Sequence, residues 1–61
     1  MNIIIDGQIC EWVNVADIYL VEGAFRTAEE YVKAHVQAGI EIVREERRYE
    51  KKVTTVYYKV L

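Results

Sequence analysis

The sequence predicts a small α+β domain in which an antiparallel sheet carries one helix packed on one of its faces. Three observations predict this fold. Apolar and polar residues alternate near both ends of the chain, as in strands with one buried face. A turn-forming Asp-Gly pair interrupts the first alternating stretch, and a helix-capping sequence stands in the middle of the chain. The predicted order is β-β-(β)-α-β-β, with the bracketed element left open between strand and helix.

The chain length sets the number of domains. The 61 residues fit a single domain, 1–61, without a linker or a repeat. Hydrophobic residues make up 52% of the chain, and a chain this short needs most of them inside to offset the entropy lost on folding. The absence of proline and the charged fraction of 30% argue against disorder. We expect a folded domain that a partner chain would stabilise further by covering an open sheet face.

The first predicted element is a hairpin. Asp6-Gly7 suits a two-residue turn in which both central residues need positive φ. Such a turn sets the strand pairing, which joins Ile5 to Gln8, Ile4 to Ile9, Ile3 to Cys10 and Met1 to Trp12. The face that we expect in the core is the one with fewer polar residues, namely Met1, Ile3, Ile5, Cys10 and Trp12.

Residues 14–22 fit two structures. The β-branched and aromatic residues of the run 18–21 favour a strand. Asn14 and Asp17, however, resemble helix-capping residues, and the apolar residues after them also follow helical spacing. We predict a strand that ends at Glu22-Gly23, with a helix as the alternative.

A helix is predicted to begin after Thr27. Thr27 and Glu30 form a capping box, and the acidic residues of this turn lie at the positive end of the helix dipole. Glu29 and Lys33 are spaced for a favourable ion pair on the helix surface. Gly39 is placed to end the helix in the left-handed conformation. The expected apolar stripe consists of Ala28, Tyr31, Val32, His35 and Val36.

Residues 40–61 predict a second hairpin. Both ends of this segment alternate, although 44–52 contains no turn-forming residue, so a helix through 40–52 is the alternative. The two faces of the last strand are Thr54, Val56, Tyr58 and Val60 on one side, and Thr55, Tyr57, Lys59 and Leu61 on the other. One helix covers only one sheet face, so we expect the second face to meet solvent or a partner.

The chain carries few residues that support catalysis. Cys10 and His35 are the one candidate nucleophile–base pair, and they are too few to form a structural zinc site. Phosphate-binding loops and paired-cysteine motifs are absent from the sequence. We therefore expect no enzyme activity, no cofactor and no metal. The chain start lacks a signal-peptide pattern and the apolar runs are short, which predicts a cytoplasmic protein without a membrane segment.

Charge is distributed unevenly along the chain. Residues 1–43 have a net charge of −5 and residues 44–61 a net charge of +3. This asymmetry is typical of a chain with an electrostatic partner surface. The alternative is that the acidic and basic elements neutralise each other within the fold.

Protein binding is the predicted function, as an inhibitor or adaptor of the kind that viruses and mobile elements encode. The candidate contact residues are the aromatic and charged residues Tyr49, Tyr57, Lys59, Arg47 and Arg48, and the acidic helix start Glu29 and Glu30. A homodimer through the terminal strands is a further expectation. The alternative function is binding of single-stranded nucleic acid by the bases and tyrosines of 44–61, against which the pI of 5.3 argues.

Overall fold

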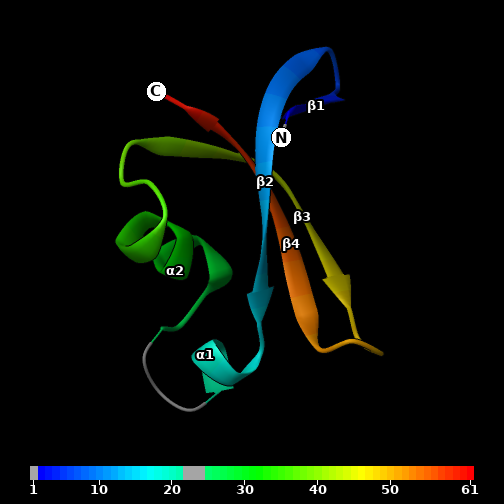
Figure 1. Ribbon diagram of the computed structural model, residues 1–61, viewed down its shortest axis with the longest axis vertical. Helices are drawn as coiled ribbons and strands as arrows, with labels where there is room; N and C mark the ends of the chain where they lie inside the picture. The colour runs from blue at the N-terminus through cyan, green and yellow to red at the C-terminus, as the bar shows by residue number, and fades with distance from the viewer. Residues whose placement is uncertain (1, 22–24) are drawn as a thin grey trace.

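The computed structural model describes residues 2–21 and 25–61. Its centre is a four-stranded antiparallel sheet in the order β1-β2-β4-β3, with a short helix packed against one face (Figure 1). The elements are β1 (Asn2–Ile5), β2 (Gln8–Ala16), α1 (Ile18–Val21), α2 (Ala28–His35), β3 (Ile40–Arg48) and β4 (Val53–Val60). The predicted α+β fold with one helix packed on the sheet is confirmed.

The first hairpin has the predicted register. Ile5 pairs with Gln8, Ile4 with Ile9, and Ile3 with Cys10. The turn residues Asp6 and Gly7 have φ of 51° and 78°, as a two-residue turn of this type requires. The predicted pair of Met1 with Trp12 lies outside the described residues.

The predicted third strand is wrong, because β2 runs on to Ala16 and is followed by the short helix α1. Ala16 pairs with Val53, the first residue of β4, so the sheet offers no partner strand beyond this point. Asp17 instead turns the chain, with its amide donating to Lys52 O at 2.9 Å and its carbonyl accepting from Leu20 N at 2.8 Å. The lack of a neighbouring strand overrides the strand propensity of 18–21. The predicted strand end at 22–23 lies outside the described residues.

Helix α2 begins as predicted but ends early. Thr27 Oγ1 accepts from Glu30 N at 3.2 Å, while the Glu30 carboxylate accepts from Arg26 N at 2.9 Å, one residue before the cap. The helix ends at His35 with Val36 as its C-cap, so the prediction that Gly39 terminates it is wrong. Gly39 lies between the helix and β3, directly before the first strand residue Ile40, and its carbonyl accepts from Leu61 N at 2.8 Å.

The second hairpin is confirmed in place of a helix. β3 and β4 pair from Ile40↔Val60 to Arg48↔Val53, with a bulge between Ile42 and Arg44. The connection is the four-residue turn 49–52, in which Lys52 has a φ of 55° and donates its amide to Tyr49 O at 3.3 Å. Pairing with β4 stabilises the charged segment as a strand. A helix over the same residues would have no apolar stripe with which to pack on the core.

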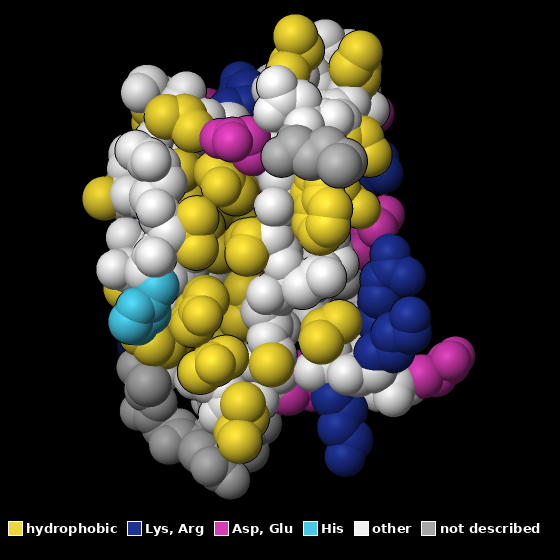
Figure 2. All heavy atoms as spheres, viewed as in Figure 1, with side chains coloured by type: hydrophobic (Ala, Val, Ile, Leu, Met, Phe, Trp, Pro, Cys, Tyr) yellow, Lys and Arg dark blue, Asp and Glu magenta, His cyan; other side chains and the backbone are white. Residues whose placement is uncertain are grey.

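The main core lies between the sheet and α2. Its buried members are Val15, Ala28, Val32, Ile40, Val56 and Tyr58. Thr54, Val56 and Tyr58 share this face of β4, as the alternation predicts. Figure 2 shows the apolar side chains gathered between α2 and the strands, while most Lys and Arg side chains in that view lie over the β3–β4 hairpin.

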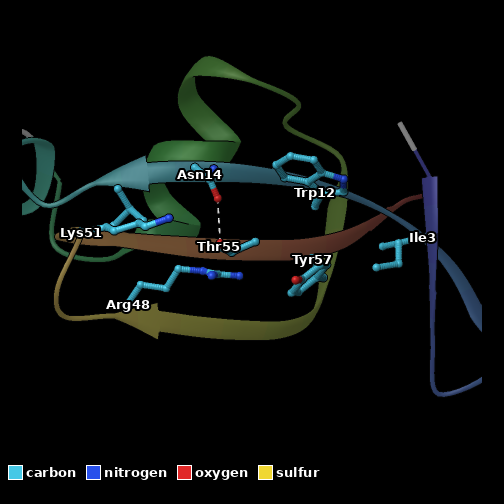
Figure 3. A pocket seen from close by; sticks show the side chains of 8 residues that line it. Ile3, Trp12, Asn14, Arg48, Lys51, Thr55 and Tyr57 are labelled. Carbon is cyan, nitrogen blue, oxygen red and sulfur yellow. Dashed lines mark hydrogen bonds between the residues drawn. The ribbon is translucent and has the colours of Figure 1, made fainter.

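The sheet face opposite α2, here called the open face, has a second and smaller core. The β1–β2 hairpin bends so that β1 runs across the direction of the other strands (Figure 3), and Ile5 and Cys10 pack against Tyr57. Ile5 and Cys10 are buried as predicted. Ile3 and Trp12 are not, with 39% and 41% of their surface exposed, because the bend leaves them at the rim of this cluster.

Candidate functional site

The open face carries a groove of about 390 Å³. Its lining comes from all four strands and from the β3–β4 turn, and consists of Ile3, Trp12, Asn14, Arg48, Lys51, Val53, Thr55 and Tyr57. Helix α2 lies behind the sheet in the close view, so it does not obstruct the groove (Figure 3). The groove is therefore a surface that the fold leaves available.

The two ends of the groove differ in chemistry. Trp12 lies opposite Tyr57 in the β2–β4 pairing, and Ile3 of the bent hairpin faces them. Arg48 lies opposite Val53 at the other end, and its side chain reaches from there along the groove to the side of Thr55, while Lys51 projects from the turn (Figure 3). One end is thus aromatic and apolar, and the other is cationic. Val53 and Tyr57 are four residues apart on one strand, so the backbone at the two ends is separated by about 13 Å.

Hydrogen bonds hold the floor of the groove in place. Thr55 Oγ1 donates to Asn14 Oδ1 at 2.7 Å, across the two central strands. The Tyr57 hydroxyl donates to Glu46 Oε1 at 3.2 Å, which fixes the ring against the sheet. Thr55 and Tyr57 are both buried, so the floor is already ordered before any ligand arrives.

Ion pairs among the described residues do not neutralise the cationic end. Among the described residues, neither Arg48 nor Lys51 has a carboxylate within ion-pair distance. Glu46 shares the open face with Arg48, but its carboxylate is bound to the Tyr57 hydroxyl and lies 3.7 Å from Arg44. The groove therefore presents two cations to an incoming anionic group.

Arg47, a candidate from the sequence, serves the fold instead. Its guanidinium donates to both carboxylate oxygens of Asp17, and this pairing lowers the pKa of Asp17 and raises the pKa of Arg47. Its guanidinium carbon also lies 5.0 Å from the centre of the Tyr49 ring. Tyr49 itself is 78% exposed, beside a smaller hollow of about 320 Å³ that shares Arg48 and Lys51 with the groove.

Ion pairs join the acidic and basic parts of the chain. Arg44 lies 3.8 Å from Asp6, Arg47 binds Asp17, and the Lys59 amine lies 3.7 Å from Glu41. Within the part of the chain that the structure describes, three of the six bases of 44–61 are therefore paired with acids of 1–43, as the neutralisation alternative predicts. The groove cations Arg48 and Lys51 are not part of these pairs.

Glu29 and Glu30 do not join the other candidates. They begin α2, which packs on the face of the sheet opposite the groove. Glu29 is paired with Lys33 at 2.8 Å and Glu30 caps the helix. Of the seven residues expected at the site, only Arg48 and Tyr57 line the groove, and Tyr57 is a buried floor residue with 9% exposure rather than an exposed contact.

Sequence reasoning missed the residue that dominates the aromatic end. Trp12 was expected in the core, since the tight turn places it on the face of Ile5 and Cys10. The bend of β2 that exposes Trp12 has no marker in the sequence, because no glycine or proline interrupts 8–16. Strand alternation does indicate that Trp12 shares a face with Asn14, but the pairing of β2 with β4 is needed to place both beside Thr55 and Tyr57.

The residues considered for catalysis lie apart. Cys10 is buried in the cluster on the open face, whereas His35 ends α2 on the other side of the sheet, with ring centres 5.2 Å from Phe25 and 5.1 Å from Tyr31. Within residues 2–21 and 25–61, no group of His, Cys, Asp and Glu side chains could hold a metal ion. The helices in that part of the chain are also too short to cross a membrane.

Comparison with known proteins gives no relative for this chain. No protein-family model matches it, and neither curated proteins nor solved structures show a significant match.

Proposed function

We propose that this chain is a non-enzymatic protein-binding module whose contact surface is the open face of the sheet. The observation that carries the proposal is the groove, which is lined together by the half-exposed Trp12, the ordered floor and the cations Arg48 and Lys51. Trp and Arg are the residues most enriched among those that dominate binding energy at protein interfaces. A large aromatic side chain on a fixed sheet also loses little entropy when a partner covers it.

The groove is suited to a macromolecule more than to a small substrate. It lies along a sheet face, and its neighbouring hollow at the turn extends the surface past Tyr49. A module of this kind either blocks a surface of its partner, as an inhibitor does, or brings the partner to another protein, as an adaptor does. Viruses and mobile elements encode small proteins of both types. We place it in the cytoplasm, where a reducing environment keeps the thiol of Cys10 intact.

Capture of partners tests the proposal. Tagged wild-type protein and a Trp12→Ala variant are exposed to lysate of the source cells, each with and without nuclease. The proposal expects a discrete protein that the wild type retains after nuclease treatment and the variant loses. A Tyr19→Ala variant is the matched control, since Tyr19 is a similarly exposed aromatic residue on α1, away from the groove. Equal capture by the wild type and the Trp12 variant contradicts the proposal.

Single-stranded nucleic acid is the second candidate ligand. Trp12 could stack on a base while Arg48 and Lys51 bind phosphates, which is how open sheet faces hold single strands. With the ring of Tyr57 buried, Trp12 is the one exposed aromatic residue of the described chain that lines the groove, Tyr49 lies outside it at the neighbouring hollow, and the chain as a whole is acidic. Loss of all captured material on nuclease treatment, with steep salt dependence, would favour this candidate.

Self-association is a further proposal, at a different edge from the expected one. β4 lies between β2 and β3, so the terminal strand has no unpaired edge. The outer edge of β3 is protected by its bulge and by charged side chains. The outer edge of β1 is short but apolar, and the cross-strand pair Ile4 and Ile9 is 69% and 67% exposed. We propose that two copies pair through β1.

A further inference from the structure

We infer that the groove binds an extended segment of the partner in which an acidic side chain and an aromatic or large apolar side chain stand four residues apart. This inference rests on the proposed function and specifies the partner's chemistry. The acidic side chain lies between Arg48 and Lys51, and the apolar side chain packs on Trp12 and Ile3. The argument depends on three properties of the groove: its length, its charge and its floor.

The length of the groove sets the spacing of the two anchor residues in an extended chain. Its two ends correspond to Val53 and Tyr57 on β4, about 13 Å apart at the rise of a strand. In an extended segment, side chains at positions i and i+4 point to the same side and span this distance. In a helix the same two positions are only about 6 Å apart along the axis. A helical segment would need anchors about nine residues apart to reach both ends, so the spacing of four residues is specific to an extended segment.

The charge of the groove selects the acidic group. Arg48 and Lys51 face the same end, and within the described chain neither has a carboxylate partner. A carboxylate placed between them would gain charge-assisted hydrogen bonds from both. A basic side chain at that position would meet two like charges, and this repulsion excludes partners of the wrong sequence.

The floor of the groove restricts the residue between the two anchors. Position i+2 of the segment lies over Thr55, whose hydroxyl is already committed to Asn14. Thr55 is buried and the guanidinium of Arg48 lies beside it (Figure 3), so a large side chain at this position would separate the acidic group from Arg48. The segment therefore carries a small or β-branched residue at its centre, which also favours the extended conformation.

Trp12 provides the readout, because it is the one tryptophan of the chain. The probes are blocked peptides in which Glu and Phe are separated by three Thr residues, made in both orders. We expect saturable changes in Trp12 fluorescence for at least one order. A peptide with Lys in place of Glu, and one with Glu and Phe adjacent, should each bind at least about tenfold more weakly, a loss of about 1.4 kcal/mol.

Charge reversal at the cationic end locates the binding site. The two variants are Lys51→Glu, in the exposed turn, and Arg48→Glu, on the edge strand. Either change should lower the affinity for the Glu–Phe peptide at least about tenfold. Arg26→Glu is the matched control, because this exposed side chain precedes α2 and does not line the groove. It should leave peptide affinity unchanged. Circular dichroism of each variant establishes that the fold is retained.

Three results would overturn the inference. One is the absence of a saturable signal with either Glu–Phe peptide up to millimolar concentration, and another is equal affinity for the Lys-containing peptide. The third is tighter binding of an oligo(dT) strand, which would also contradict the proposed function. If the peptides fail but Trp12→Ala still abolishes capture of a protein partner, the proposed function stands and only the segment chemistry is wrong.

Discussion

Arg47 and Asp17 form a two-pronged ion pair that joins residues 30 positions apart in the sequence. Asp17 is the residue at which the chain leaves the sheet after β2, and Arg47 lies near the end of β3. The pair therefore holds the turn into α1 against the second hairpin. A substitution of Arg47 would therefore disturb the fold, whereas Arg48 can be changed to test binding.

The Asp17–Arg47 pair predicts a specific loss of stability in acid. The hydrogen bonds from Arg47 lower the folded-state pKa of Asp17, so the pair contributes stability above the ordinary carboxylate pKa of about 4. This contribution disappears as the pH falls through the lowered pKa. Asp17→Asn should therefore lower the melting temperature at neutral pH, and the difference from wild type should vanish in strong acid. A difference that stays constant down to strong acid would contradict this assignment.

The burial of Tyr58 predicts how the stability of the fold changes at alkaline pH. Burial against the core raises its pKa, and the nearby Glu11 carboxylate raises it further. Stability is then complete below the ordinary tyrosine pKa of about 10 and falls as the pH rises through the raised value. In a tyrosinate absorbance titration, the last transition should be absent from Tyr58→Phe. Ionisation of Tyr58 together with the exposed Tyr49 would show that its ring is not buried in solution.

The main core predicts unequal effects from two similar substitutions on one helix. Val32 is completely buried beneath α2, whereas Val36 at its end is exposed. Val32→Ala should lower the free energy of unfolding by about 1.5–3 kcal/mol, because buried apolar surface is lost. That is a large share of what so small a core supplies. Val36→Ala should change it by about 0.5 kcal/mol or less. Urea unfolding measures both, and equal effects would mean that α2 packs differently.

The elements that the sequence predicts correctly are those determined by residues close together in the chain. The register of the first hairpin follows from Asp6-Gly7, and the start of α2 follows from Thr27 and Glu30, because these signals act over a few residues. The second hairpin was also predictable, since the β-branched start of β4 outweighs the helix formers before it.

The errors all arise where a distant segment decides the structure. Residues 18–21 are helical because β4 has no residue left to pair with them, and Gly39 lies beyond the helix, next to β3, where its carbonyl accepts from Leu61 N. Trp12 was expected to be buried and is half-exposed, whereas Tyr57 was expected to be exposed and is buried. The reason is that the β1–β2 hairpin folds over the open face and packs on Tyr57. The groove depends on the pairing of β2 with β4 and on this bend, so strand alternation alone could not identify its lining.

Pairing through β1 predicts a change of mass with concentration. Sedimentation at rising micromolar concentrations should show the 7.2 kDa chain approaching twice its mass. Ile4→Lys should keep it monomeric, because it places a charge on the apolar edge strand. Ile18→Lys is the matched control, since Ile18 is also an exposed isoleucine but lies on α1. A constant monomer mass for the wild type would exclude pairing through β1. Loss of dimerisation to the same extent in both variants would exclude it as well.

Photo-cross-linking from the groove tests the central claim most directly. Trp12 is replaced by benzoylphenylalanine in one protein and the α2 residue Lys33 in another, and each is irradiated in nuclease-treated lysate of the source cells. Both substituted proteins must first show wild-type circular dichroism. The account predicts a discrete protein adduct from position 12, competed by excess unmodified protein, and no such adduct from position 33. An adduct that forms from position 33 and not from position 12 would contradict it, because the partner would then bind the helix and not the open face.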